Sequence, residues 1–220
     1  MRIFYRFKVF GIILTSIFIL LSSTNSVVAE NTPNLAIETK AMSEGTKIPE
    51  VSKLKTVKGK NFDLNKAISE KPTVLIFYRG GWCPYCNAQL SKLNSIESKL
   101  VEMGFQIIAI SPDKPENLRE SIKKHKLTYL LLSDSKMETA KAFGVAFKVD
   151  EATLFKYKAI GIDLKKASGE DHKLLPVPSV FIIDTTGIIK FKYSNPDYKV
   201  RIEPEIILNE AKALVEKNKR

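Results

Sequence analysis

The chain of 220 residues has few cysteines and histidines, the residues that stabilise disulfide-rich and metal-binding proteins. It contains two cysteines, which excludes a scaffold dense in disulfides. Two histidines leave little material for a histidine-based metal site, and ten glycines and ten prolines exclude collagen-like and proline-rich sequences. Apolar residues make up 44% and charged residues 27%, which is typical of a chain that folds into one ordinary globular domain.

Acidic residues are outnumbered by basic ones, and the formal net charge is +11. Many of the lysines are spaced as on the outer face of a helix, for example Lys92 and Lys99 or Lys123 and Lys124. This spacing favours a solvated basic surface over a nucleic-acid-binding site. We therefore expect no nucleic-acid partner.

The first 29 residues contain no acidic residue and have the pattern of a secretory signal. Arg2, Arg6 and Lys8 precede an apolar run over residues 9–21, and small residues end the segment at Ala29. A helix of that run rises about 20 Å, which is short of the roughly 30 Å hydrocarbon core. We expect cleavage near Ala29, export (to the periplasm in a Gram-negative source) and no stable membrane span afterwards; an uncleaved anchor is the alternative.

Strand and helix signals alternate along the rest of the chain. Residues 30–47 lack periodicity and predict a flexible leader, whereas residues 48–217 predict a single domain. Buried strands are predicted over 73–78, 106–111 and 129–132, a hairpin over 180–193, and helices from about 83 to 103, 115 to 125, 137 to 143 and 204 to 217. This order predicts an α/β fold with a mixed central β-sheet and helices on both faces. Residues 149–175 fit no regular element and are interpreted as an insertion.

Both cysteines lie in the segment Arg79–Cys86, with the sequence RGGWCPYC, just after a predicted buried strand. Residues three apart on a first helical turn are roughly 5–6 Å apart, which one disulfide can span. The unpaired N–H groups at the helix start, together with Arg79, favour the thiolate of Cys83. Cys86, one turn further on, is placed to attack a mixed disulfide on Cys83.

Two other interpretations of the cysteine pair are open. The pair can be half of a zinc site, but the chain holds no second cysteine pair. It can also be a structural disulfide, but a bridge that closes so small a loop stabilises a fold weakly. Redox chemistry that needs no metal or organic cofactor is therefore the leading interpretation.

Three further residues are candidates for substrate contact. Pro178 directly precedes a predicted buried strand and is a candidate for a cis peptide bond. In that case Val177 and Pro178 would offer backbone groups to an extended substrate; the alternative is a proline that simply begins a strand. Trp82 shields Cys83, packs on a partner, or simply packs at the rim of the site.

These residues carry a resemblance. The order of elements around the cysteine pair is similar to the thioredoxin fold, and four phrases resemble the peroxiredoxin-like branch of the alkyl hydroperoxide reductase/thiol-specific antioxidant (AhpC/TSA) family. The phrases are Phe77–Cys86, Ile108–Asp113, Leu132–Asp134 and Asn195–Tyr198. The resemblance covers roughly residues 48–215 and implies a thiol-based antioxidant or redox enzyme. It places Cys83 where that family keeps its peroxide-attacking cysteine.

The chain departs from true peroxiredoxins at the positions that bind peroxide in that family. Ile76 and Gly80 stand where the family has Pro and Thr, and Val177–Pro178 stands where it has Arg. The pair CPYC is the one typical of glutaredoxins. The sequence thus favours exchange with protein disulfides, in which Cys83 attacks, Cys86 closes the disulfide and a partner thiol protein resets the pair.

Two alternatives to that expectation remain. The first is peroxiredoxin-type reduction of hydroperoxides with Cys83 as the peroxidatic cysteine. The second is a non-enzymatic module whose disulfide is structural.

Overall fold

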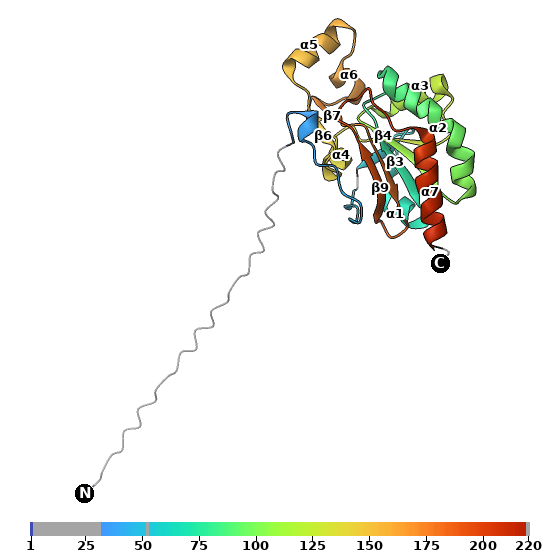
Figure 1. Ribbon diagram of the computed structural model, residues 1–220. Helices are drawn as coiled ribbons and strands as arrows, with labels where there is room; N and C mark the ends of the chain where they lie inside the picture. Colours follow the sequence, from blue (N-terminus) through green and yellow to red (C-terminus); the bar gives the residue numbers. More distant parts are fainter. Residues whose placement is uncertain (2–31, 52, 219–220) are drawn as a thin grey trace. The chain divides into compact units, whose positions relative to one another are not determined.

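A seven-stranded mixed sheet with the order β2-β1-β5-β4-β3-β8-β9 forms the centre of the structure (Figure 1). The computed structural model describes Met1 and residues 32–51 and 53–218. The strands are β1 (Leu54–Thr56), β2 (Asn61–Phe62), β3 (Thr73–Phe77), β4 (Gln106–Ser111), β5 (Leu130–Ser133), β8 (Ser179–Ile183) and β9 (Ile189–Ser194). β3, β4 and β5 are parallel, whereas β8 pairs antiparallel with β3 and β9. The predicted α/β class and mixed sheet are confirmed.

Alternate residues of the central strands enter two separate hydrophobic clusters. In β3, Val74 and Ile76 belong to one cluster, and Leu75 and Phe77 belong to the other. Side chains of a strand point to opposite faces in turn, so the two clusters are the two faces of the sheet. A strand buried on both faces needs an unbroken apolar run, and β3 is buried at all of its positions.

Helices cover both faces, as the sequence predicts. The helices that pack with the Val74 cluster are α2 (Pro84–Glu102), α3 (Pro115–His125) and α7 (Pro204–Asn218). The helices on the Leu75 cluster are α1 (Leu64–Glu70) and α4 (Glu138–Ala142). α2 is long enough to cross the sheet and buries Leu90, Leu93 and Ile96 on one stripe.

The predicted insertion differs from expectation because it contains regular structure. It holds α5 (Glu151–Ala159), α6 (Leu164–Ser168) and β7 (Leu174–Pro176), and β7 pairs with β6 (Ala146–Lys148) in a small separate sheet. Asp150 and Asp163 cap the two helices by accepting hydrogen bonds from N–H groups three residues later. α5 buries no residue fully, so it has no apolar stripe for a periodicity argument to find.

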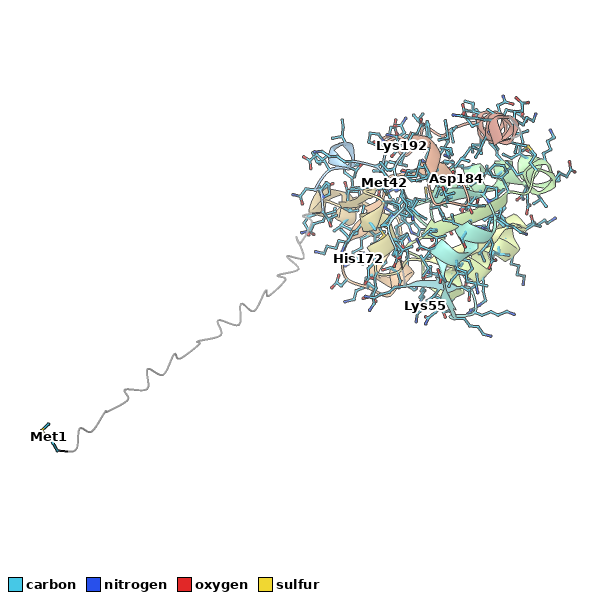
Figure 2. All side chains as sticks on the ribbon, turned by 90° about the horizontal axis from the view of Figure 1, so that it is seen from below. Met1, Met42, Lys55, His172, Asp184 and Lys192 are labelled. Carbon is cyan, nitrogen blue, oxygen red and sulfur yellow. The ribbon has the colours of Figure 1, made fainter. Side chains whose placement is uncertain are left out.

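Residues 30–47 also differ from the flexible leader that the sequence predicts. The described part starts at Thr32 and runs along the domain: the Met42 amide donates to Phe143 O at 3.0 Å and the Gly45 amide donates to Ile189 O at 2.8 Å. The Lys192 amide donates to the Glu44 carboxylate, and Figure 2 shows Lys192 and Met42 in the same part of the structure. Backbone pairing, which carries no sequence signature, holds this segment.

The predicted signal sequence, residues 1–29, lies almost wholly outside the described residues, so its cleavage stays a prediction. Among the helices that the structure describes, none combines the length and the apolar character that crossing a bilayer requires.

Candidate active site

Cys83 lies at the N-cap of α2, at the end of a loop that follows β3. Gly80 in this loop has φ +141°, a conformation that favours glycine, and its carbonyl accepts the Cys83 amide at 3.1 Å. Pro84 occupies the start of the helix, where its missing N–H costs nothing. The local sequence therefore places the Cys83 sulfur at the positive end of a 19-residue helix.

The surroundings of Cys83 favour its thiolate, although the residue is only 1% exposed. The largest effect is the hydrogen bond that the Cys86 thiol donates to the Cys83 sulfur, and burial opposes it. The backbone N–H of Cys86 and the guanidinium groups of Arg79 and Arg201 act in the same direction as that hydrogen bond. Together they lower the pKa of Cys83 to about 6, so Cys83 is largely ionised at neutral pH.

Cys86 is the protonated partner of this pair. Both cysteines are free thiols, and Cys86 is fully buried. Burial and the neighbouring Cys83 raise the pKa of Cys86 well above its usual value, and Arg201 lowers it. The Arg201 Nη2 group donates to the Cys86 sulfur at 3.4 Å. The pair thus holds one proton, on Cys86, and one negative charge, on Cys83.

Arg79 is buried among aromatic rings. Its guanidinium carbon lies 4.0 Å from the ring centre of Tyr198, 5.1 Å from that of Trp82 and 5.5 Å from that of Tyr157. It also donates a hydrogen bond to the Tyr157 hydroxyl, while no carboxylate in the described residues forms an ion pair with it. Aromatic faces attract a guanidinium without neutralising it, so the positive charge still acts on Cys83.

Trp82 packs against this cation within the protein. Its ring centre is 5.7 Å from that of Tyr157 on α5, so the insertion contributes directly to the surroundings of the cysteine pair. Of the predicted substrate-contact residues, Arg79 and Trp82 are brought together with Cys83 and Cys86.

A buried carboxyl lies beside the same loop. The Asp113 Oδ2 atom accepts the Gly81 amide at 2.6 Å, and burial raises the pKa of Asp113 to about 7. A Cβ atom added to Gly80 would lie 2.8 Å from Asp113 Oδ1 and closer still to Trp82 Nε1. The space that a larger residue would fill at position 80 is therefore taken by Trp82 Nε1 and Asp113 Oδ1, and neither atom has a hydrogen-bond partner.

The structure corrects one expectation at Val177 and Pro178, the cis peptide bond. The described residues contain no cis peptide bond, so the Val177–Pro178 bond is trans. The Val177 amide donates to Val145 O at 2.8 Å, and Val177 O accepts the Ser179 hydroxyl. These backbone groups of Val177 have partners inside the protein, beside the strand pair of β6 and β7. Contact of Val177 and Pro178 with a substrate stays a prediction.

Four residues of the site were not predicted from the sequence as site residues. Tyr157, Tyr198, Arg201 and Asp113 come from the insertion, the segment before α7 and the end of β4. Asp113 and Tyr198 stand inside phrases that resemble the AhpC/TSA family, which is a usable signal. Nothing in the sequence distinguishes Arg201 from other basic residues. The described residues hold no cluster of three or more His, Cys, Asp or Glu side chains that fits a metal ion.

Comparison with known proteins identifies the family. The model of the AhpC/TSA family matches residues 45–192, which is most of the chain. The chain belongs to the AhpC/TSA family. A chloroplastic peroxiredoxin Q of Populus jackii is 26% identical over 163 residues, covering 74% of this chain and 63% of that protein. A putative peroxiredoxin of Haemophilus influenzae is 36% identical over 75 residues, covering 34% of this chain and 48% of that protein. The chain thus spans about half to just under two thirds of these two relatives.

Solved structures show the same fold for this AhpC/TSA member. The peroxidoxin BcpB of Mycobacterium tuberculosis superposes with a TM-score of 0.62 at 21% identity, covering 79% of this chain and 98% of the other. A peroxiredoxin Q of Xanthomonas campestris gives a TM-score of 0.58 at 18% identity, covering 75% and 91%. The expected thioredoxin-type fold is confirmed.

Proposed function

We propose that the chain is a thiol-dependent peroxidase that reduces hydroperoxides with Cys83. The observation that carries the proposal is the ionised Cys83 at the start of α2, in a chain that belongs to the AhpC/TSA family. The peroxiredoxin relatives favour this function over exchange with protein disulfides, the function that the cysteine spacing alone favours. A thiolate is the form that attacks peroxide oxygen, and Arg79 lies beside it without a neutralising carboxylate.

The reaction that fits these residues has two steps. The Cys83 thiolate attacks the terminal oxygen of the hydroperoxide, the O–O bond breaks, and the leaving alkoxide takes a proton from water. The product on Cys83 is a sulfenic acid. Cys86 then attacks the Cys83 sulfur, an intramolecular disulfide forms, and water leaves. The second residue of the pair acts quickly because it is already one helical turn away.

Exchange with protein disulfides is the second candidate function. The observation in its favour is the buried Cys86 thiol, whose hydrogen bond to Cys83 is the arrangement that a mixed disulfide needs for rapid release. It uses the same two residues, so the two functions differ in the first substrate and not in the site.

Stopped-flow oxidation of the reduced protein separates the two functions. Hydrogen peroxide and an organic hydroperoxide should each oxidise wild type to the internal disulfide. Cys86→Ala should consume about one equivalent and leave a sulfenic acid that dimedone labels. Cys83→Ala is the control and should consume none. Oxidation of wild type no faster than that of an ordinary thiol, with partner proteins trapped on Cys83 in Cys86→Ala, would instead establish disulfide exchange.

A second thiol protein completes the proposed cycle, because the internal disulfide must be reduced. A yeast mitochondrial peroxiredoxin with a similar fold is described with a resolving mechanism through glutathione and thioredoxin systems, at a TM-score of 0.62. We take a thioredoxin-type protein as the reductant for this chain. Turnover with a thioredoxin and its reductase, and none with the reductase alone, is the expected result.

Export is the remaining part of the proposed function. The basic start, the apolar run and the small residues at Ala29 support a signal that is removed on export. Amino-terminal sequencing of the protein from the cell envelope should begin at Glu30. A mature protein that begins at Met1 would favour an anchor.

A further inference from the structure

Arg201 makes a direct contact with the cysteine that attacks second. Its Nη2 group donates to the Cys86 sulfur at 3.4 Å, although the two residues are 115 positions apart in the sequence. Its Nε group is buried without a hydrogen-bond partner, and none of the ion pairs among the described residues includes Arg201. A positive charge is thus held against Cys86, and the carboxylate of the same cleft, Glu203, forms its ion pair with Lys92 instead.

Few titratable groups face Cys86. Cys83 lies on the same helical turn, Tyr78 lies at the end of β3, and Arg201 comes from the segment before α7; Arg79 acts on Cys86 only through its backbone. In the reduced protein burial, followed by the negative Cys83 sulfur, keeps the proton on Cys86, and among the described residues Arg201 is the cation that acts against them. Asp113 acts on Cys83 and Tyr78.

We propose that Arg201 is the residue that makes Cys86 the nucleophile once Cys83 has reacted. This inference rests on the proposed function only in that Cys83 reacts first. When the Cys83 sulfur forms a covalent bond to oxygen or to another sulfur, it loses its negative charge and no longer holds the Cys86 thiol by a hydrogen bond. The charge of Cys83 and its hydrogen bond with the Cys86 thiol, which kept Cys86 protonated, are then lost. The contact between Arg201 and Cys86 is unchanged.

The chemical step balances without a further reactant. Cys86 gives up its proton, its sulfur attacks the Cys83 sulfur, and the new S–S bond forms as the S–O bond of the sulfenic acid breaks. The departing hydroxide combines with the proton and leaves as water. If the leaving group is a thiol, that thiolate takes the proton instead.

Arg201 lines a cleft of about 200 Å³ between α2 and the start of α7, together with Tyr85, Gln89 and Lys199. Arg79, by contrast, lies among aromatic rings, and its charge acts on Cys83. Arg201 also lowers the pKa of Cys83, but its hydrogen bond goes to Cys86.

An aromatic disulfide, dithionitrobenzoate, tests this assignment without any peroxide. Attack by Cys83 releases one coloured thiolate, and attack by Cys86 on the adduct releases a second, so the two phases report the two cysteines separately. In Arg201→Gln we expect the second phase to slow by about tenfold or more at neutral pH, with its pH midpoint moved upward by about one unit or more. Arg201→Lys, which keeps the charge, should fall between Gln and wild type. The first phase should change less than the second.

Lys199→Gln is the matched control, because it removes a positive charge from the same cleft without touching Cys86. An unchanged second phase in Arg201→Gln, or an equal effect in Lys199→Gln, would overturn the proposal. The pH midpoint is the decisive reading, because a purely structural loss would slow the phase without moving it. If hydroperoxides fail to oxidise Cys83 while the Arg201 effect is present, the proposed peroxidase function fails and this inference stands.

Discussion

At the scale of single residues, the acidity of Cys83 depends more on its neighbour in sequence than on distant charges. The hydrogen bond from the Cys86 thiol is the largest influence that lowers the pKa of Cys83, ahead of Arg79 and Arg201. Cysteine spacing, helix start and Arg79 can all be read from eight consecutive residues, Arg79–Cys86. That is why the sequence alone predicts the reactive cysteine.

Replacing Cys86 should therefore raise the pKa of Cys83. We expect Cys86→Ala to raise it by about one to two units, because a hydrogen bond to a charged group contributes about 1.5–3 kcal/mol. Cys86→Ser, which keeps a donor, should raise it less. The rate of alkylation of Cys83 against pH gives each value directly.

Arg79→Gln provides the comparison for that measurement. Arg79 ranks below the Cys86 hydrogen bond among the influences on Cys83, so its loss should raise the pKa by less than Cys86→Ala does. A larger effect of Arg79→Gln would show that the cation, and not the neighbouring thiol, sets the acidity of Cys83.

The rest of the site could not be predicted at this scale. Tyr157, Tyr198 and Arg201 are brought to the cysteines only by the path of the chain through α5 and before α7. Only Tyr198 has a signal in the sequence, the phrase Asn195–Tyr198, whereas Tyr157 has none and Arg201 resembles any other surface cation. A proline directly before a strand does not by itself distinguish a cis from a trans bond, and the bond at Pro178 is trans.

At the scale of elements, the sequence predicts the central strands from unbroken apolar runs and the long helices from a periodic buried stripe. β4 is predicted at residues 106–111 and observed as Gln106–Ser111, and α3 is observed as Pro115–His125. The elements that were missed are short or lack a buried face, such as β1, β2 and α5. Side-chain caps and backbone pairing hold them, and neither has a clear period in the sequence.

The segment 32–47 offers an element-scale prediction through Gly144. Gly144 has φ +68°, and a Cβ atom there would lie 3.0 Å from the Lys40 carbonyl carbon and closer still to its oxygen. Gly144→Ala should lower the free energy of unfolding by about 1–2 kcal/mol for the left-handed backbone and about 1–3 kcal/mol more for overpacking. Denaturant unfolding of the reduced protein measures the loss.

Gly104→Ala is the matched control. Gly104 also follows a helix and has φ +86°, but a Cβ atom there meets nothing within 4 Å. It should show the backbone cost alone. Equal losses of unfolding free energy in the two variants would mean that the segment around Lys40 moves aside at no cost and contributes little to the stability of the fold.

At the scale of the whole molecule, buried carboxyls couple stability to pH. Asp113 and Asp134 are 1% and 2% exposed, and burial raises the pKa of each to about 7. An aspartate in an unfolded chain titrates near about 3.9. Between these values the folded protein keeps protons that the unfolded chain has released. The stability that each carboxyl contributes is therefore complete below about pH 4 and is lost as pH rises toward about 7.

Cys83 couples stability to pH in the opposite direction. Its folded pKa of about 6 is below the value of a free thiol, so its contribution to stability is complete above about pH 8.5 and is lost as pH falls through about 6. Burial also lowers the pKa of His125 and His172, which adds stability as pH rises to about 6.5. The profile of the wild type is the sum of these opposing effects, so the influence of one carboxyl has to be isolated with a variant.

Asp113→Asn isolates the effect of the Asp113 carboxyl on stability. The amide oxygen can still accept the Gly81 amide, while the titrating proton is removed. The difference in unfolding free energy between Asp113→Asn and wild type should shift in favour of the variant as pH rises from about 4 to about 7, by about 1 kcal/mol per pH unit, and then stay level. Urea unfolding of the reduced proteins across that range gives the difference.

Asp184→Asn is the control: the pKa of Asp184 is lowered beside Lys190, so its difference should change only below about pH 4. A flat difference for Asp113→Asn from about pH 4 to about 8 would show that this carboxyl is ionised beside Cys83 over the whole of that range.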